Sequence, residues 1–240
     1  MGEYWWSSRQ ACMTLVDTAS GSESLPVEVP EAFRLLRPCI HYGWEMVLLA
    51  AELLRPDSPL RLQGPRAYAA DYSLRSQQAL EAWGWQPAQL QESLEQVRRK
   101  AVAVDRSAWL ARHRPFPGVV ERLAGLAAEG VDWVVLTTKG AAFTAELLSS
   151  LQLLPSELYG HESGSKPEVL LRLASQRLLR GFVEDRRATL ETVLATPGLA
   201  SLPCYLASWG YLKPEDRQSL PRGIHLLEPE ALASPLASWP

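Results

Sequence analysis

The sequence has few of the residues that build disulfide frameworks or metal sites. Its three cysteines, Cys12, Cys39 and Cys204, are widely separated and form no C-x-x-C pair. The four histidines also lack the spacing of a metal-binding motif. We therefore expect reduced, buried thiols in a cytoplasmic protein, rather than disulfides or a zinc site.

Long apolar runs and an excess of positive charge are missing as well. No stretch of roughly 20 residues is continuously apolar, as a membrane-spanning helix requires, and the amino terminus lacks the basic and apolar regions of a signal peptide. The net charge is −3, with 24 basic and 27 acidic residues. This balance predicts no nucleic acid among the partners of the chain, and the lack of an apolar span predicts no membrane.

Strand patterns are absent from the first half of the chain, whereas helical periodicity is frequent there. We predict one helical domain over residues 1–113, with loops at Asp17–Pro30 and Pro56–Pro65. The predicted helices cover Glu3–Val16, Glu31–Leu36, Gly43–Leu54, Ala67–Trp83 and Pro87–His113.

Alternating strands and helices are predicted from residue 114 onward, beginning with the stretch VDWVVLTTKG at residues 131–140. A short apolar run between two glycines is typical of a strand buried on both faces of a parallel sheet. The order predicts an α/β domain over residues 114–240 with a loose tail. The predicted strands are Val131–Thr137, Leu158–Gly160, Gly181–Val183, Pro203–Ala207 and Ile224–Leu227, and the helices are Gly140–Leu151, Pro167–Leu178 and Arg186–Leu194.

Five polar residues stand where strands end or helices begin, which is where α/β sheets carry their chemistry. The hydroxyls of Thr137 and Thr138 suit an anion. Lys166 precedes Pro167 at a helix start, where a cation opposes the helix dipole unless an anion joins it. The adjacent carboxylates of Glu184 and Asp185 repel each other unless a cation such as Mg²⁺ lies between them. Each residue also has a purely structural interpretation, as a helix cap, a solvated lysine or helix-start acids.

This order of hydroxyl, ammonium and acidic pair resembles the second, third and fourth motifs of the haloacid dehalogenase-like (HAD) hydrolases. The resemblance covers residues 114–212 and implies a three-layer, Rossmann-like core. It implies that Thr137 hydrogen-bonds a phosphoryl group, that Lys166 neutralises it, and that Asp185 and Glu184 hold Mg²⁺. The implied activity is a Mg²⁺-dependent phosphatase acting on a small phosphorylated metabolite through an aspartyl-phosphate.

The first motif of that family, a strand followed by D-x-D-G, is missing. Seven aspartates occur in the chain and no two are spaced i, i+2. Asp17 is the closest imitation, but Ala19 stands where the second acid belongs. Two explanations remain open: the nucleophilic aspartate lies upstream of Met1, or the protein is a catalytically inactive HAD-like binding or scaffold protein.

The helical domain resembles the cap that some HAD proteins insert after the first motif. Under this hypothesis Arg37, His41 and Glu45 are candidates for substrate contacts. If the nucleophile strand is absent, the strands Val131–Thr137 and Gly181–Val183 should leave a slot between them instead of pairing. A third alternative, an α/β nucleotide-binding module, is disfavoured because neither G-x-G-x-x-G nor a P-loop occurs.

Overall fold

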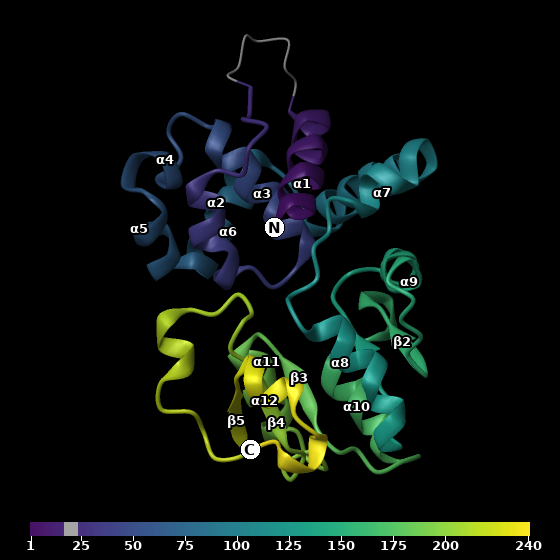
Figure 1. The fold of residues 1–240 in the computed structure, drawn as a ribbon. Helices are drawn as coiled ribbons and strands as arrows, with labels where there is room; N and C mark the ends of the chain where they lie inside the picture. The colour runs from purple at the N-terminus through teal and green to yellow at the C-terminus, as the bar shows by residue number, and fades with distance from the viewer. Residues whose placement is uncertain (17–23) are drawn as a thin grey trace. The chain divides into compact units, whose positions relative to one another are not determined.

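The protein, described here from a computed structural model, divides into two compact units, Met1–Arg114 and Pro115–Pro240. The structure describes residues 1–16 and 24–240, so the comparison of Asp17 with the first HAD motif lies outside the described residues. The described part of the first unit contains helices and no strands, and the second unit alternates strands and helices (Figure 1).

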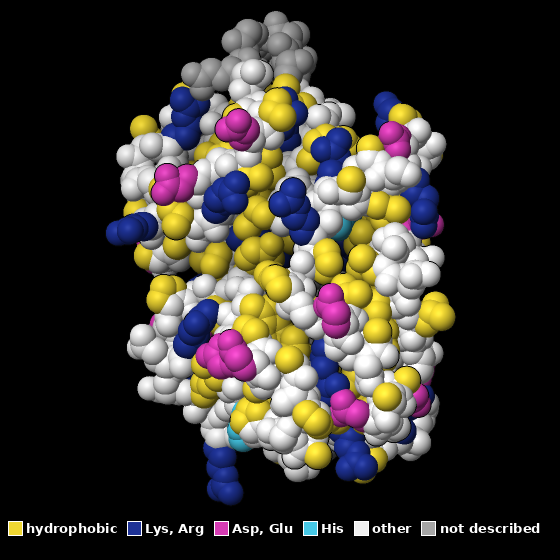
Figure 2. All heavy atoms as spheres, viewed as in Figure 1, with side chains coloured by type: hydrophobic (Ala, Val, Ile, Leu, Met, Phe, Trp, Pro, Cys, Tyr) yellow, Lys and Arg dark blue, Asp and Glu magenta, His cyan; other side chains and the backbone are white. Residues whose placement is uncertain are grey.

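The surface carries charges of both signs. On the face shown in Figure 2, Lys and Arg side chains are interspersed with Asp and Glu. Of the helices in the described part of the chain, none combines the length and the apolar character that crossing a membrane requires.

Seven α-helices make up the described part of the amino-terminal unit. Gly43–Leu54 begins and ends as predicted, but the predicted loop Pro56–Pro65 contains a short helix capped by the Ser58 hydroxyl. The helix predicted over Ala67–Trp83 is broken at Asp71, whose ψ of 36° is not helical. The helices are α1 (Gly2–Leu15), α2 (Glu31–Leu36), α3 (Gly43–Leu54), α4 (Pro59–Gln63), α5 (Pro65–Ala70), α6 (Tyr72–Trp83) and α7 (Pro87–Leu110).

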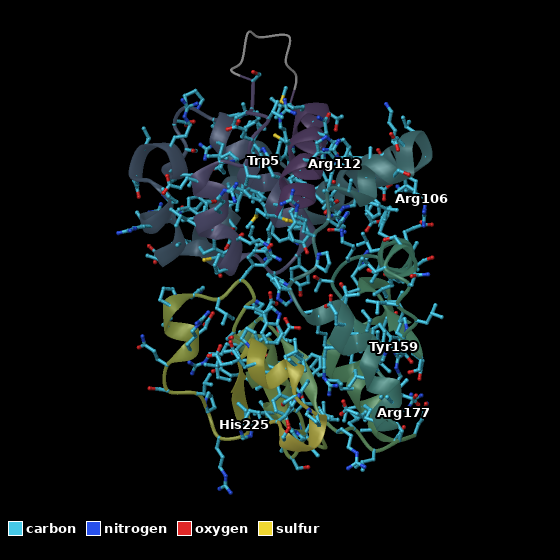
Figure 3. The ribbon with its side chains drawn as sticks, viewed as in Figure 1. Trp5, Arg106, Arg112, Tyr159, Arg177 and His225 are labelled. Atoms are coloured by element: carbon cyan, nitrogen blue, oxygen red, sulfur yellow. The ribbon has the colours of Figure 1, made fainter. Side chains whose placement is uncertain are left out.

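The core of this unit forms where α1, α3 and α7 pack together. Trp5 of α1, labelled in Figure 3, is 1% exposed and packs edge-on against Phe33. The Glu3 carboxylate, also buried, accepts hydrogen bonds from Arg98 Nε of α7 at 2.7 Å and from Ser7 Oγ at 2.7 Å. A desolvated ion pair therefore joins α1 to α7 across 95 residues of sequence.

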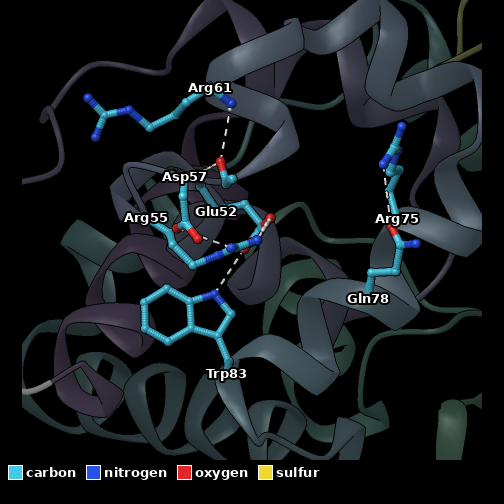
Figure 4. Close-up of polar contacts among 8 residues, drawn as sticks. Glu52, Arg55, Asp57, Arg61, Arg75, Gln78 and Trp83 are labelled. Atoms are coloured by element: carbon cyan, nitrogen blue, oxygen red, sulfur yellow. Dashed lines mark hydrogen bonds and ion pairs between the residues drawn. The ribbon is translucent and has the colours of Figure 1, made fainter.

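A second buried carboxylate, that of Glu52, connects α3 to neighbouring segments of the unit (Figure 4). Glu52 of α3 is fully buried and accepts hydrogen bonds from Arg55 at 2.8 Å and from the Trp83 indole at 3.0 Å. The Ser58 hydroxyl donates to the Glu52 carbonyl at 2.6 Å, which ties the start of α4 to the end of α3. These bonds supply the partners that a buried charge requires.

The carboxy-terminal unit contains five short strands, each close to a predicted one. They are β1 (Val134–Leu136), β2 (Glu157–Tyr159), β3 (Phe182–Glu184), β4 (Cys204–Ala207) and β5 (Ile224–Leu227). The helices of this unit are α8 (Val119–Gly125), α9 (Ala141–Ser150), α10 (Lys166–Ala174), α11 (Arg187–Ala195) and α12 (Pro229–Ala233). The prediction of a mixed α/β unit is confirmed at this coarse level.

The strands form two parallel sheets rather than one. In the first sheet β1 pairs with β2 in the register Val135↔Leu158, and in the second sheet the order is β3-β4-β5. Strand β4 is buried at every residue, whereas β1 is only half-buried. As expected from the sequence, β1 and β3 are not hydrogen-bonded to each other in the described part of the chain.

The prediction of a loose carboxy-terminal tail is wrong. The Glu129 carboxylate accepts a hydrogen bond from Leu236 N at 2.8 Å and pairs with the Arg122 guanidinium. The Trp239 ring packs edge-on against Tyr205 of β4, with centroids 5.2 Å apart. Polar anchors and one aromatic contact therefore hold a segment whose composition alone is typical of a loop.

Candidate functional site

The candidate site is built at the carboxyl end of β3, where the chain brings Lys166 to Glu184. Lys166 opens α10, followed by Pro167 in the first turn, and the Ser165 hydroxyl caps the helix. The Lys166 ammonium pairs with the Glu184 carboxylate across 18 residues of sequence. Both side chains are largely buried, at 18% and 11% exposure. Two of the predicted site residues therefore meet directly.

Burial and two neighbouring charges act on the pKa of Glu184 in opposite directions. Burial raises the pKa of this carboxyl above its ordinary value, the Lys166 ammonium opposes the shift, and the Asp185 carboxylate adds to it. The other carboxylate oxygen accepts a hydrogen bond from Arg186 N at 3.2 Å. A bound cation, in addition to the Lys166 ammonium, would reduce the repulsion between the Glu184 and Asp185 carboxylates.

Asp185 is held by a turn that the sequence analysis did not identify. Its Oδ2 accepts a hydrogen bond from Tyr211 N at 3.2 Å. A Cβ added at Gly210 would lie only 2.1 Å from Asp185 Cβ, so this position excludes any side chain. The feature of the sequence that could have indicated this turn is the glycine in S-W-G-Y, which follows a buried strand. Gly210 and Tyr211 are therefore positioning residues for Asp185.

Thr137 and Thr138 follow β1, at the end of the strand where they were predicted. Thr137 N donates to the Tyr159 carbonyl at 2.9 Å, and Thr137 Oγ accepts from Lys139 N at 3.0 Å. The Thr137 hydroxyl hydrogen is not used in that contact and can point toward an acceptor. Leu136, immediately before Thr137, lines one cavity together with Glu184 and Asp185. The hydroxyls thus follow a strand that borders the same cavity as the acidic pair.

The amino terminus of α9, which follows Thr137 and Thr138 in the chain, carries a carboxylate in this structure. Ala141 N donates to Glu162 Oε1 at 3.0 Å. Gly160 permits this close approach, because a Cβ there would lie 2.4 Å from Ala141 N. An anionic oxygen at a helix amino terminus is the arrangement in which helices bind phosphoryl groups. Glu162 is a third residue, after Gly210 and Tyr211, that the sequence predictions missed.

The three predicted substrate contacts of the helical unit lie around the start of α3. Glu45 Oε2 accepts hydrogen bonds from His41 N at 2.6 Å and Tyr42 N at 2.5 Å. Arg37 lies over the Tyr4 ring, 4.9 Å from its centroid, and donates to the Ile40 carbonyl at 3.3 Å. Glu45 therefore has a helix-capping role, and a role of these residues in substrate binding stays a prediction.

The chemistry of the donor set is compatible with Mg²⁺. Within residues 1–16 and 24–240 no group of three or more His, Cys, Asp or Glu side chains is arranged to hold a metal ion. Mg²⁺ usually takes only one or two carboxylates, with water and substrate phosphate completing its octahedron. Glu184 and Asp185 would supply those carboxylates.

Comparisons of the chain with protein-family models, with curated proteins and with solved structures find no significant match. No relative therefore adds a residue role to those that follow from the geometry of this chain and from its motifs.

Proposed function

We propose that the carboxy-terminal unit is a HAD-like core whose site binds Mg²⁺ and the phosphoryl group of a small metabolite. The observation that carries the proposal is the contact between Lys166 and Glu184 at the end of a parallel strand. A cation at a helix start beside two carboxylates is unusual for a purely structural pair, and a bound phosphoryl group would account for it. The three-layer, Rossmann-like arrangement of the family is part of this proposal.

Each residue has a defined role in this site. The Lys166 ammonium offsets the charge of the phosphoryl oxygens, and the Thr137 hydroxyl donates a hydrogen bond to one of them. Glu184 and Asp185 would hold Mg²⁺, whose charge supplies electrostatic stabilisation of a phosphate ester when the ion is bound. Tyr211 N fixes the orientation of the Asp185 carboxylate.

Hydrolysis through an aspartyl-phosphate requires one further group. The route needs a nucleophilic aspartate followed by an acid two residues later, and residues 1–240 contain no such pair. We therefore expect residues 1–240 to bind Mg²⁺ and phosphate without turning over a phosphate ester.

A second candidate is a HAD-like binding or scaffold protein without catalysis. The observation in its favour is that the site groups already satisfy each other, Glu184 through Lys166 and Asp185 through Tyr211 N. Such a protein would keep the fold and bind neither Mg²⁺ nor phosphate measurably.

The two candidates are separated by calorimetric titration of the chain with inorganic phosphate, with and without Mg²⁺. We expect weak, Mg²⁺-dependent phosphate binding that both Asp185→Asn and Lys166→Gln remove. The matched controls Asp71→Asn and Lys100→Gln, at exposed positions of the helical unit, should leave it unchanged. Absence of Mg²⁺-dependent binding would favour the scaffold.

A parallel assay with p-nitrophenyl phosphate tests the catalytic part of the proposal. We expect no turnover by residues 1–240. Robust turnover that Asp185→Asn abolishes would mean that an acid outside the D-x-D-G pattern is the nucleophile.

A further inference from the structure

The loop between β4 and β5, residues 208–223, carries the backbone amide that contacts Asp185 (Figure 1). Tyr211 N of this loop donates to Asp185 Oδ2 at 3.2 Å. The Gly210 backbone also lies close against the Asp185 side chain, so the orientation of the carboxylate depends on the position of the loop. The contacts that fix the loop therefore also fix Asp185.

Arg187, the first residue of α11, holds this loop by three backbone carbonyls. Its Nη1 donates to the Gln218 carbonyl at 2.7 Å and to the Glu215 carbonyl at 3.4 Å. Its Nη2 donates to the Ser219 carbonyl at 3.3 Å. Its Nε donates to Glu191 Oε1 at 2.8 Å, which orients the guanidinium from within α11. A planar guanidinium can hold several acceptors at once, so this one side chain connects the far part of the loop to the start of α11.

Two further contacts close the loop on itself on either side of Tyr211. Arg217 donates to the Ser208 carbonyl at the start of the loop. Asp216 Oδ2 accepts a hydrogen bond from Lys213 N at 2.9 Å. Because these contacts join both flanks of Tyr211 to the far part of the loop, a displacement of that part would carry the Tyr211 amide with it.

Apolar contacts offer a competing explanation for the position of the loop. Leu212 and Leu220 are partly buried and pack against a core cluster of this unit. If these contacts alone fixed the loop, removal of the Arg187 guanidinium would leave Tyr211 N in place. The chain order favours a role for the guanidinium, because Asp185 and Arg187 are two residues apart between β3 and α11 and contact the same loop at different points.

We propose that Arg187 is a positioning residue for the Asp185 carboxylate. By holding the loop against α11, it keeps Tyr211 N on Oδ2 and so fixes the direction of Oδ1, the oxygen with which Asp185 would bind Mg²⁺. The part of this inference that concerns Mg²⁺ rests on the proposed function, whereas the effect on the Tyr211 amide concerns the loop alone.

Amide hydrogen exchange of the full chain, followed residue by residue by NMR, tests the effect on the loop. In Arg187→Met the Tyr211 amide should exchange at least about tenfold faster than in the unaltered chain, while the paired amide of Phe182 in β3 should exchange as before. The control is Arg172→Met, which removes a donor to a backbone carbonyl outside the loop and should change neither amide. Unchanged exchange at Tyr211, or the same acceleration at Phe182, would overturn the proposal.

Titration of the same variants with Mg²⁺ tests the effect on Asp185. Removal of a positive charge beside a cation site would by electrostatics alone strengthen Mg²⁺ binding. We expect the opposite, a dissociation constant for Mg²⁺ at least about threefold higher in Arg187→Met. Arg187→Lys, which keeps the charge but lacks the planar fork, should change it in the same direction. Tighter or unchanged Mg²⁺ binding by Arg187→Met would overturn the role of Arg187 in positioning the ligand oxygen.

The two measurements separate failure of this inference from failure of the proposed function. If the unaltered chain binds no Mg²⁺, the proposed function fails, and exchange of the Tyr211 amide decides whether Arg187 positions the loop. If Arg187→Met does not fold, Arg187→Lys is measured in both assays, and unchanged values in that variant would overturn the proposal.

Discussion

At the scale of single residues, the position of Asp185 depends on the absence of a side chain at Gly210. The two residues come from different loops, after β3 and after β4, and approach so closely that a Cβ at position 210 would overlap Asp185. The backbone of Gly210 is not in the left-handed region, so conformational freedom is not the reason for glycine here. The space that Asp185 occupies is the reason.

We predict that Gly210→Ala destabilises the chain by about 1–3 kcal/mol, the usual cost of overpacking, and weakens Mg²⁺ binding. The control is Gly125→Ala, where an added Cβ meets nothing within 4 Å and alanine favours the helix. Urea denaturation and Mg²⁺ titration of both variants provide the measurement. Equal stability of the two variants would mean that the loops at positions 185 and 210 are farther apart than the structure shows.

At the scale of elements, buried ion pairs join helices that are distant in the chain. Arg98 and Arg99 are neighbours on α7, yet Arg98 is 3% exposed and pairs with buried Glu3, whereas Arg99 is 51% exposed and pairs with exposed Glu92. Removing one member of a buried pair leaves an uncompensated charge, whereas an exposed pair contributes little.

We therefore predict that Arg98→Met lowers the free energy of unfolding by about 3–5 kcal/mol, while Arg99→Met changes it by less than about 1 kcal/mol. Chemical denaturation followed by circular dichroism measures both. Similar losses in the two variants would show that packing of the α7 side chains, not the Glu3 contact, sets the stability of this helix pair.

The anchoring of the carboxy-terminal segment should depend on pH. The Arg122 guanidinium and then the Leu236 amide lower the pKa of Glu129 from 4.5 to about 2. Because the folded-state pKa lies below the ordinary value, this contribution to stability is present above pH ~4.5 and is lost as pH falls toward 2.

We predict that Glu129→Gln lowers the melting temperature at pH 7 and speeds exchange of the Leu236 amide. The difference in melting temperature from the unaltered chain should shrink as pH falls from about 4.5 toward 2. Glu230→Gln, at an exposed position of α12, serves as the control. A difference that stays constant with pH would contradict a role for the ionised carboxylate.

Among helices and strands, the sequence predictions were most accurate where the local apolar pattern was longest. Gly43–Leu54 was predicted at both ends because its apolar positions repeat over three turns. Helix α4 was missed although Ser58 and Pro59 form a local helix-start signal, and the break at Asp71 was missed because it depends on one backbone angle. The strands were located within a few residues by their apolar runs and flanking glycines.

At the scale of the whole molecule, the two units differ in how completely their cores are filled. The core of the helical unit draws on residues between Met1 and Val97. The carboxy-terminal unit divides its core into two clusters and contains a cavity lined in part by residues of β1 and β3. A cavity removes packing contacts and lowers stability.

We predict that a fragment of residues 1–114 keeps its helical circular dichroism and unfolds cooperatively, since its core is complete. A fragment of residues 115–240 should unfold at a lower temperature. The control is residues 1–86, which lack α7 and with it the buried Leu90, Leu94 and Arg98, and should not fold. An unfolded 1–114 fragment would contradict a self-contained helical core.

The sequence by itself determined the types and order of most of the elements, the sequence of a helical half followed by an α/β half, and the placement of the candidate residues at strand ends and helix starts. These follow from local periodicity, from glycine and proline, and from residue chemistry at strand ends. Only the tertiary structure decided that Lys166 reaches Glu184 and that Gly210 makes room for Asp185. Pairing and close approach depend on the free energy of burying distant segments against each other, and a local pattern carries no information about which segments will meet.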